Sequence, residues 1–588
     1  MPLPVVLQRL AVPAPDDDDA HLPLFWRGRA RCEPGVAGPV VERGDTLDLG
    51  TWQNAAPVGW WARLGIGSVR LEVHGAGELT VHVSTAGERR VLARATLPTD
   101  GSWSRELPTS GVDWCWLELT AGPDGGALAS ADWTVRDGAE PRPLTVVVPT
   151  YRAEDDALSQ LARLTAPGLA GVVGRVVLID QGGTLAAYPG TPDALAAAGD
   201  RVLLVEQPNL GGSGGYSRGL LEADRHWPED PVFLHDDDAR AHPETLRRLT
   251  VLAAAAPGAF FATGLLDADA PTSLQALAEG VARRPFRWGP SDGIDESEPV
   301  DVGAGGPETW SFTHPDDGAE YGGWWGCLVP AGAARELGLA APYFLKWDDA
   351  EYGLRAGAAG WGVRALPGLA VHHPTWATKG TSSSWSSWPL HRNRLATAAA
   401  YGAGLGVLAD SLAHQVKHVL SLQYGTAELW NAAIAEVVGG SGWLDGDLTA
   451  VRPRAQALLD DAPASPVVAL PAAAAPAVPT PRSSALQAGM RAVVGLVRRA
   501  GTSRSGAVAT LPGPSDFGWA DGLGRDAVVF ADGAAPLVRD PRRARRALLR
   551  TVRLHVSAAV RWRSLRRDYA RALPAASSER AWRVRFGL

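Results

Sequence analysis

Three consecutive aspartates stand at the end of an apolar run in "VFLHDDDARA", which extends from Val232 to Ala241. Asp236 and Asp238 are two positions apart, so in extended backbone their carboxylates leave the same face of the chain. Like charges this close raise each other's pKa, and a divalent cation would remove the repulsion. Hard oxygen ligands suit Mg²⁺ or Mn²⁺ with phosphate oxygens completing the shell. The alternative is a solvated acidic loop.

A second group of ionisable side chains lies in "YFLKWDDAEYGLRA". Lys346, Trp347, Asp348 and Asp349 come just before a predicted helix, and Lys346 is one of only three lysines in a chain that otherwise uses arginine. A carboxylate at a helix N-terminus is commonly a cap. Beside a glycosyl donor it could instead act as a general base. These residues alone leave both interpretations open.

Aromatic and imidazole side chains supply further candidates. Trp324 and Trp325 in "YGGWWGCLVP" could stack on sugar faces or fill a core strand. His372 and His373 in "GLAVHHPTW", and His391 in "PLHRNRL", are possible metal ligands. Imidazole would favour Mn²⁺ over Mg²⁺, although a single histidine is more often a hydrogen-bonded structural residue.

A glycine-rich stretch, "QPNLGGSGGYSRG", runs from Gln207 to Gly219. Its glycines permit close backbone approach, and the N-terminus of the helix that follows favours anions. The pattern is neither the dinucleotide-binding nor the P-loop fingerprint. A mobile turn therefore remains the alternative to an anion site.

These residues are positioned by alternating strands and helices that begin at Leu144. We expect strands in "LTVVVPTY", "RVVLIDQGG", "RVLLVEQPN" and "PVFLHDDDA", and helices in "EDDALSQLARL", "GGYSRGLLEADRHW" and "PETLRRLTVLAAAA". This alternation predicts a parallel, doubly wound α/β sheet, whose ligands bind beyond the carboxyl ends of the strands. The three aspartates fall at such an end.

The flanking regions differ from this pattern. Residues 1–140 alternate apolar and polar side chains with period two, as in "SVRLEVHG" and "ELTVHVST". These segments are expected to be separate strands joined by a glycine-containing turn, and several such short strands favour a β-sandwich. Six tryptophans in this region could form a sugar platform, but a core or interface role is favoured: Trp52, Trp60, Trp61, Trp103, Trp114 and Trp116. Residues 141–395 then form the α/β domain.

Residues 396–588 are predicted to be helical, beginning with the long segment "LATAAAYGAGLGVLADSLAHQVKHVL" and interrupted near 462–483 by a Pro/Ala-rich linker. The C-terminal segment is strongly basic. Leu549, Val552, Val556 and Val560 would make an apolar stripe on a helix there. This helix could lie on an anionic membrane surface or pack on the helical domain with a solvated basic face.

Composition narrows the class of protein. The chain has 588 residues, so we expect more than one domain. Its net charge of −8 argues against a generic nucleic-acid binder. Three cysteines without a CxxC pair indicate a reducing compartment and no structural zinc site. Without a signal peptide pattern or an apolar run long enough to span a bilayer, the expected location is cytoplasmic.

Taken together, these motifs resemble the bacterial, mycobacterial-type galactofuranosyltransferases that polymerise cell-wall galactan, which are GT-A enzymes of glycosyltransferase family 2. The resemblance covers most of the chain, from "TWQNAAPVGWWARLGIGSVRL" through "PTYRAEDD", "NLGGSGG", "HDDDA", "GGWWGCLVP", "FLKWDDAEYGLRAG" and "HHPTW" to "HRNR". The order of the motifs is more specific than any one of them. It implies a central GT-A domain between an N-terminal β-sandwich and a C-terminal helical domain.

The resemblance also implies roles for individual residues. Asp236, Asp238 and His373 would be the metal ligands, and Asp349 the catalytic base. The nucleotide contacts would be Tyr151, Arg152, Gln181, Asn209 and Asp237. Sugar or acceptor contacts would be Trp324, Trp325, Lys346, Trp347, Asp348, Trp376 and His391. The family's "TFNR" reads "TYRA" here, where Arg152 would substitute for the family's arginine from the adjacent position.

The activity implied is inverting, metal-dependent transfer of galactofuranose from UDP-galactofuranose to a lipid-linked galactan acceptor, with Mn²⁺ favoured over Mg²⁺. The resemblance also implies a homo-oligomer. The expected location is the inner face of the cell membrane, and the basic C-terminal helices are the candidate surface for the membrane or for another subunit. A related family 2 transferase using another nucleotide sugar is the alternative among enzymes. A non-catalytic glycan-binding scaffold is the alternative outside them.

Overall fold

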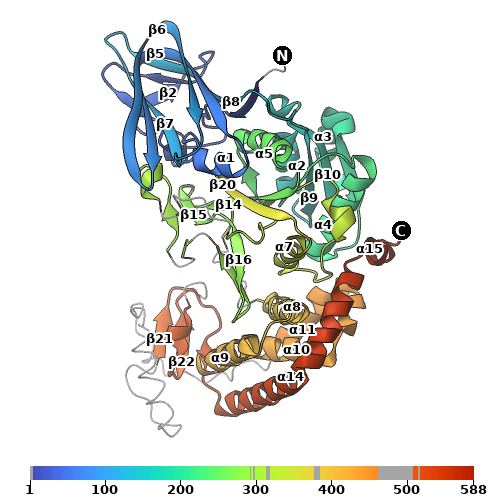
Figure 1. Ribbon diagram of the computed structural model, residues 1–588. Coiled ribbons are helices and arrows are strands. Elements are labelled where there is room, and N and C mark those ends of the chain that lie inside the picture. The colour runs from blue at the N-terminus through green and yellow to red at the C-terminus, as the bar shows by residue number, and fades with distance from the viewer. Residues whose placement is uncertain are drawn as a thin grey trace.

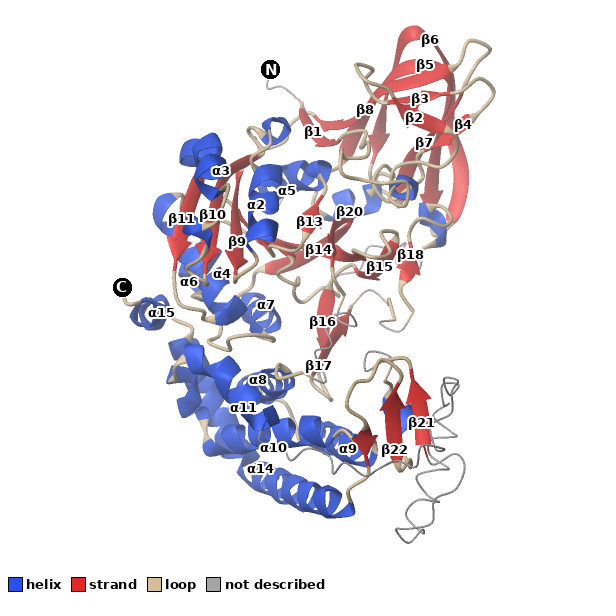
Figure 2. Ribbon diagram, turned by 180° about the vertical axis from the view of Figure 1, so that it is seen from behind, coloured by secondary structure: helices blue, strands red, loops and turns tan. Residues whose placement is uncertain are grey.

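The computed structural model describes residues 4–291, 293–295, 298–310, 312, 318–375, 384–460, 508–513 and 517–588. An all-β region, a central α/β region and a helical region follow one another along the chain and from top to bottom of Figure 1. The last helix returns to the central region, where the C-terminus lies (Figure 2). The multidomain α/β class expected from the sequence is confirmed.

The N-terminal region is built from strands that belong to one hydrogen-bonded sheet, in which the two longest form an antiparallel hairpin. The elements are β1 (Val5–Gln8), β2 (Ala30–Cys32), β3 (Pro39–Val41), β4 (Thr46–Asp48), α1 (Val58–Arg63), β5 (Ser68–Thr85), β6 (Glu88–Pro108), β7 (Trp114–Thr120) and β8 (Gly126–Val135). The strands therefore form one continuous sheet rather than two separate sheets.

The segments predicted as two strands, "SVRLEVHG" and "ELTVHVST", are the two halves of β5. The pairing register shifts between Gly75 and Gly77. A Cβ at Gly75 would lie 2.3 Å from the Ala127 carbonyl oxygen, and Gly77 has φ +135°. Glycine thus lets the strand bend without ending. The predicted turn is a bulge.

The tryptophans of this region are core residues, as favoured from the sequence. Trp52 and Trp114 have no exposed surface, and Trp116, Trp60 and Trp61 are buried. Only Trp103 is partly exposed. A loop of the central region joins this core, because Trp310 packs edge-on against Trp114 with ring centroids 5.3 Å apart. The cluster therefore binds the two regions together.

The central region begins with β9 (Leu144–Thr150), α2 (Glu154–Leu164), β10 (Val173–Asp180), α3 (Thr191–Ala198), β11 (Val202–Glu206), α4 (Gly211–His226), β12 (Val232–His235), β13 (Arg240–Ala241) and α5 (Pro243–Ala255). It continues with β14 (Ala259–Asp267), β15 (Ser273–Ala276), β16 (Glu279–Ala282), β17 (Arg287–Pro290), β18 (Val300–Asp301), β19 (Gly326–Val329), α6 (Ala333–Leu337), α7 (Asp348–Ala358) and β20 (Gly362–His373).

The central sheet has the order β11-β10-β9-β12-β19-β14-β15-β18, with β20 paired to β14 and β13. Strands β9 to β12 are parallel, as predicted. Alternate side chains of β9 face opposite layers: Val146 and Val148 join the core that contains α2 and α5, and Val147 joins the core that contains α4. The sheet is therefore doubly wound.

Beyond β12 the sheet departs from the expected parallel arrangement. Strand β19 runs antiparallel to β12 and to β14, and β20 is parallel to β14. The sheet is mixed because the chain leaves β12 through the acidic loop and returns much later, as β19, in the opposite direction. The arrangement places the end of β20 beside the end of β12.

The C-terminal region contains α8 (Ser387–Ala400), α9 (Gly406–Leu420), α10 (Tyr424–Gly439), α11 (Val451–Asp460), α13 (Trp519–Gly522), α14 (Pro541–Ala576) and α15 (Glu579–Phe586). The first long helical segment expected from the sequence is divided into α8 and α9. A small sheet that sequence reasoning missed is formed by β21 (Val508–Leu511), β22 (Ala527–Phe530) and β23 (Leu537–Val538). The predicted Pro/Ala linker lies outside the described residues.

Helix α14 packs on the helical region through buried residues such as Trp562 and Tyr569. The predicted apolar stripe lies on another side of the helix, since Leu549, Val556 and Val560 are 64%, 58% and 80% exposed. The stripe therefore does not pack on the helical region. Within the described ranges, no helix has both the length and the apolar character needed to span a bilayer.

Candidate active site

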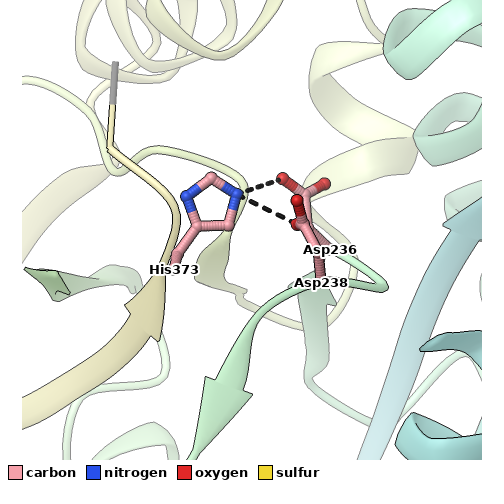
Figure 3. Close-up of side chains that lie close together, drawn as sticks. All are labelled: Asp236, Asp238 and His373. Carbon is pink, nitrogen blue, oxygen red and sulfur yellow. Dashed lines mark ion pairs between the residues drawn. The ribbon is translucent and has the colours of Figure 1, made fainter. Parts of the chain in front are cut away.

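Two aspartates and a histidine converge where β12 and β20 end (Figure 3). Asp236 and Asp238 follow the last residue of β12, and His373 is the last residue of β20. The His373 Nε2 atom lies 3.3 Å from an Asp236 carboxylate oxygen and 3.1 Å from one of Asp238. Strands β13 and β20 pair antiparallel directly beside this group, which fixes the separation of the two chain segments.

The donor set fits a divalent cation. Adjacent ligand atoms of an octahedral ion with bonds of about 2.1 Å lie roughly 3.0 Å apart, close to the 3.1 and 3.3 Å separations found here. The two aspartate side chains are about one third exposed, whereas that of His373 is 7% exposed. The open side of the group could therefore admit oxygen atoms of a phosphate.

Two residues that sequence reasoning missed hold the acidic loop. The Gln160 amide on α2 donates hydrogen bonds to the carbonyl oxygens of Asp236 and Ala239, at 3.0 and 2.7 Å. The Tyr216 hydroxyl on α4 contacts an Asp236 carboxylate oxygen and the Trp324 carbonyl oxygen. Both are polar residues on buried helix faces. A glutamine on the apolar side of the amphipathic segment "EDDALSQLARL" was the signal that could have found the first.

The predicted nucleotide-contact residues follow the ends of neighbouring parallel strands. Tyr151 and Arg152 come after β9, Gln181 after β10 and Asn209 after β11. The Gln181 side-chain oxygen accepts a hydrogen bond from the backbone N–H of Leu210, at 3.0 Å. Because β9, β10 and β11 are parallel neighbours, these residues lie along one edge of the sheet. Their roles stay predictions.

Arg152 has an unusual backbone conformation for a non-glycine residue, with φ +55°. Its guanidinium lies over the Tyr151 ring, 5.4 Å from the centroid. Asp237 is partly buried between its two acidic neighbours. Burial raises the pKa of Asp237 to about 7, against the opposing effect of a hydrogen bond from Thr150. This edge of the sheet therefore combines the positive charge of Arg152 with the carboxyl group of Asp237, whose pKa is raised.

A cleft of about 280 Å³ opens beside the metal-ligand group. Asp236 and His373 line one side of it. The predicted base Asp349 also lines the cleft. So do five residues predicted as sugar or acceptor contacts, which are Trp324, Trp325, Lys346, Trp347 and Asp348. The tryptophans are mostly buried, so they form the walls of the cleft. The structure thus brings residues from four separate sequence motifs to one cavity.

Asp348 and Asp349 begin helix α7 and have different surroundings. Asp348 is 6% exposed, and its carboxylate accepts a hydrogen bond from the Ser213 hydroxyl at 2.9 Å. Asp349 is more exposed, and its carboxylate accepts the N–H of Ala350 at 2.7 Å. Burial raises the pKa of both carboxyl groups, and the positive charge of Lys346 opposes the shift. Asp349 is the member of the pair with room to receive a proton from the cleft.

The segment that leads into α7 is conformationally strained. Phe344, Lys346 and Trp347 have φ of +72°, +70° and +71°. The left-handed region costs an L-residue on the order of 1–2 kcal/mol, so the surrounding structure must hold this loop in place. On one side stands Gly211, where a Cβ would lie 1.9 Å from the Phe344 carbonyl oxygen. The glycine-rich stretch is therefore an ordered helix start packed against the loop.

One predicted contact residue, His391, lies away from this group. His391 is 1% exposed and lies within the helical region, where its ring stacks on Trp430 at 3.7 Å and its Nε2 atom contacts the Ser411 hydroxyl. It does not line the cleft. Trp376 lies outside the described residues.

Comparison with known proteins extends these observations. Residues 141–396 match the family described as "Glycosyltransferase like family 2". Over 424 residues the chain is 32% identical to galactofuranosyltransferase GlfT2 of Mycolicibacterium smegmatis, which covers 68% of this chain and 65% of that protein. Over 575 residues it is 29% identical to the Mycobacterium tuberculosis protein of the same name, covering 91% and 89%. The family match, the sheet order and the acidic strand end identify the central region as a GT-A domain.

Among solved structures, one similar to this chain is described as GalNAc-T7 with UDP, GalNAc and Mn²⁺. It is 11% identical, with a TM-score of 0.33, and the alignment covers 45% of this chain and 49% of the other.

Proposed function

We propose that this chain, which belongs to the mycobacterial-type galactofuranosyltransferases of glycosyltransferase family 2, transfers galactofuranose from UDP-galactofuranose to a growing, lipid-linked cell-wall galactan. The observation that carries the proposal is one cleft lined by Asp236, His373 and Asp349. It combines a candidate cation site with a candidate general base. A glycosyltransferase needs the first for the leaving diphosphate and the second for the acceptor hydroxyl.

The metal ligands in this proposal are Asp236, Asp238 and His373, and the imidazole favours Mn²⁺ over Mg²⁺. A bound divalent cation supplies positive charge that stabilises the departing diphosphate. Tyr216 and Gln160 keep the acidic loop in place through the hydrogen bonds described above. Tyr151, Arg152, Gln181, Asn209 and Asp237 would contact the nucleotide along the adjoining sheet edge.

Asp349 accepts the proton of the acceptor hydroxyl as that oxygen attacks the anomeric carbon. The new C–O bond forms on the face opposite the departing UDP, whose bond to the anomeric carbon breaks in the same step. The configuration inverts, and no covalent sugar–enzyme intermediate is needed. The arrangement parallels the single base of an inverting glycosidase. The raised pKa of Asp349 suits proton uptake near neutral pH.

The remaining cleft residues would bind the sugars. Trp324, Trp325 and Trp347 offer aromatic surface against sugar rings. Lys346 can donate hydrogen bonds to hydroxyl groups, and Asp348, held by Ser213, can accept them. His391 could affect the acceptor only indirectly, since it lies within the helical region. A related transferase using another nucleotide sugar is the second candidate, and a non-catalytic glycan-binding scaffold the third.

The exposed stripe on α14 supports the proposal that the protein is peripheral to the inner face of the cell membrane. Leu549, Val552, Val556 and Val560 are between 49% and 80% exposed. Many arginines share this helix, whose sequence begins "PRRARRALLRTVRLHV". Apolar side chains flanked by cations suit an anionic lipid surface. The same surface could instead join subunits of the proposed homo-oligomer.

The test is UDP release from UDP-galactofuranose with a lipid-linked galactofuranosyl acceptor mimic, first with Mn²⁺ and then with a chelator. Metal-dependent release together with longer galactofuranosyl products supports the proposal. Tight UDP binding without turnover would indicate another sugar or acceptor. Absence of both binding and turnover would favour the scaffold. Asp238→Asn is the control, because it keeps the shape of the side chain and removes one ligand charge.

A further inference from the structure

The "HRNR" motif at 391–394 lies in α8, outside the cleft. It contacts two loops: the one that leads into α7, which lines the cleft, and the turn between β16 and β17, whose two strands line the cleft through Glu279 and Trp288. We propose that Arg392, Asn393 and Arg394 are positioning residues that hold both loops in place. They would thereby set the position of the base Asp349 and of the β16–β17 hairpin that lines the cleft. This inference rests on the proposed function, because it concerns the acceptor side of the same cleft.

Asn393 holds the loop that leads into the base. Its side chain has no exposed surface, and its amide nitrogen lies 2.9 Å from both the Leu345 and the Lys346 carbonyl oxygens. An amide has two N–H donors, and these are shared among three carbonyls of the same loop, since the Tyr343 carbonyl oxygen also lies 3.3 Å from the nitrogen. The Leu345 and Lys346 carbonyls belong to the left-handed segment just before Asp349. The loop is thus held by Asn393 in addition to its close packing against Gly211.

Arg392 fixes the orientation of that amide. Its Nε donates to the Asn393 side-chain oxygen at 3.0 Å, and one of its terminal nitrogens donates to the Tyr343 carbonyl oxygen at 3.2 Å. The guanidinium also lies 3.9 Å from the centroid of the Trp443 ring. Since the amide oxygen must accept from Arg392, the nitrogen must face the loop.

Arg394 holds the other loop. Its Nε donates to the Phe286 carbonyl oxygen at 2.8 Å, in the turn between β16 and β17, and its terminal nitrogen pairs with Asp410. Phe286 stacks on Trp347, with ring centroids 5.6 Å apart and planes 16° apart. Through this stack the β16–β17 turn and the loop that leads into α7 support one another.

Backbone strain is concentrated at these two loops. The described part of the chain contains seven non-glycine residues with positive φ, and four of them belong here: Phe286, Phe344, Lys346 and Trp347. Strained backbone persists only where its surroundings fix it, and it gathers at functional sites. The motif donates to carbonyls in both strained segments, so loss of these donors should release the loops rather than unfold the domain.

The main test is Asn393→Asp in the full chain. The new side chain has the same shape but can donate at most one hydrogen bond, and only when protonated. We expect kcat to fall about 10²-fold, because small misplacement of a catalytic group costs that much. Dissociation constants for UDP and Mn²⁺ should stay within about threefold, since their ligands lie on other elements.

Asn431→Asp is the matched control. Asn431 is also fully buried, on the neighbouring helix α10, and its side-chain oxygen accepts hydrogen bonds from Gln415 and Thr551. It contacts neither loop, so the control should keep wild-type kcat. Equal losses of kcat in the two variants would overturn the proposal, because they would indicate a general effect of a buried carboxyl group.

Hydrogen exchange of the segment 343–350 gives a readout that does not depend on turnover. Asn393→Asp should accelerate exchange there, and Asn431→Asp should not. Unchanged exchange would overturn the clamp even if the wild-type protein proved inactive towards UDP-galactofuranose. Inactive wild-type protein with the expected exchange would instead refute only the proposed function.

Arg394→Lys separates the two loops and covers the case in which Asn393→Asp fails to fold. Lysine keeps the charge beside Asp410 but lacks the fork that reaches both Asp410 and the turn. We expect the acceptor KM to rise about tenfold, with donor KM unchanged and kcat within about threefold, because the turn joins β16 and β17, which line the cleft through Glu279 and Trp288. Unchanged acceptor KM would overturn this half of the proposal.

Discussion

Replacing Asp349 with asparagine tests the chemistry of the cleft most directly. The change keeps the side-chain shape, and the new amide oxygen can still accept the 2.7 Å hydrogen bond from the Ala350 N–H. It removes the capacity to take up a proton. The helix start and the metal ligands Asp236 and His373 are left as they are, so the variant isolates proton transfer from binding.

The size of the effect follows from general-base catalysis, which contributes about 10²–10⁴-fold to a rate. That range corresponds to about 3–5 kcal/mol in the barrier at ~1.4 kcal/mol per tenfold change. Folding should not suffer. Burial raises the pKa of Asp349 in the folded protein above its value in the unfolded chain. The contribution of this carboxyl group to folding stability is therefore fully present at pH values below the unfolded pKa, and it is lost as the pH rises through the folded pKa. At pH 8 the ionised carboxylate opposes folding, and asparagine removes that cost.

The assay is UDP release at saturating donor, acceptor and Mn²⁺, with UDP affinity measured in parallel. We expect kcat of Asp349→Asn to fall by the range above and UDP affinity to stay near that of the wild-type protein. Asp348→Asn is the matched control, since the amide oxygen can still accept from Ser213, and its kcat should fall less than tenfold. Near-normal turnover by Asp349→Asn, or a larger loss in Asp348→Asn, would refute the assignment of the base.

Three further predictions concern the metal, the proton and the surface. His373→Ala should weaken Mn²⁺ binding by at least about 100-fold, as measured by electron paramagnetic resonance titration, because it removes a ligand; unchanged affinity would exclude the site. The acid limb of kcat should lie above the ordinary carboxyl range and move to higher pH in Lys346→Met, since the Lys346 charge lowers the pKa of Asp349; a limb that does not move would contradict that coupling. Val560→Glu should reduce co-sedimentation with anionic liposomes, whereas Val91→Glu, at a residue 46% exposed in the N-terminal region, should not; equal binding by both would argue against the α14 stripe as the lipid contact.

Local patterns determined most of the central region. Helix α2 covers the predicted segment "EDDALSQLARL" from Glu154 to Leu164, and β12 ends immediately before Asp236. Period and composition suffice here because the spacing of apolar side chains within each segment already indicates its type. The order of the motifs along the chain also indicated the family, and comparison with known proteins then supported that assignment.

Where local patterns failed, a distant contact decided the structure. Strand β5 continues through Gly75 because β8 and β6 pair on either side of it, although glycines in sequence resemble a turn. Strand β19 is antiparallel because of where the chain returns to the sheet. The stripe that begins at Leu549 faces outward because another face of α14 carries the packing residues. No window of sequence contains these partners.

For the site, the sequence by itself determined the donor types and the ends of the strands that carry them. It contained Asp236, Asp238 and Asp349 as candidates, and His373 as one of three possible histidine ligands that only a resemblance told apart. Their meeting in one cleft is a tertiary result, since the register of β13 on β20 brings His373 to the acidic loop. The supporting hydrogen bonds of Gln160 and Asn393 belong to the tertiary structure as well, because a buried amide is identified by what it contacts, and its contacts are set only when separate helices pack.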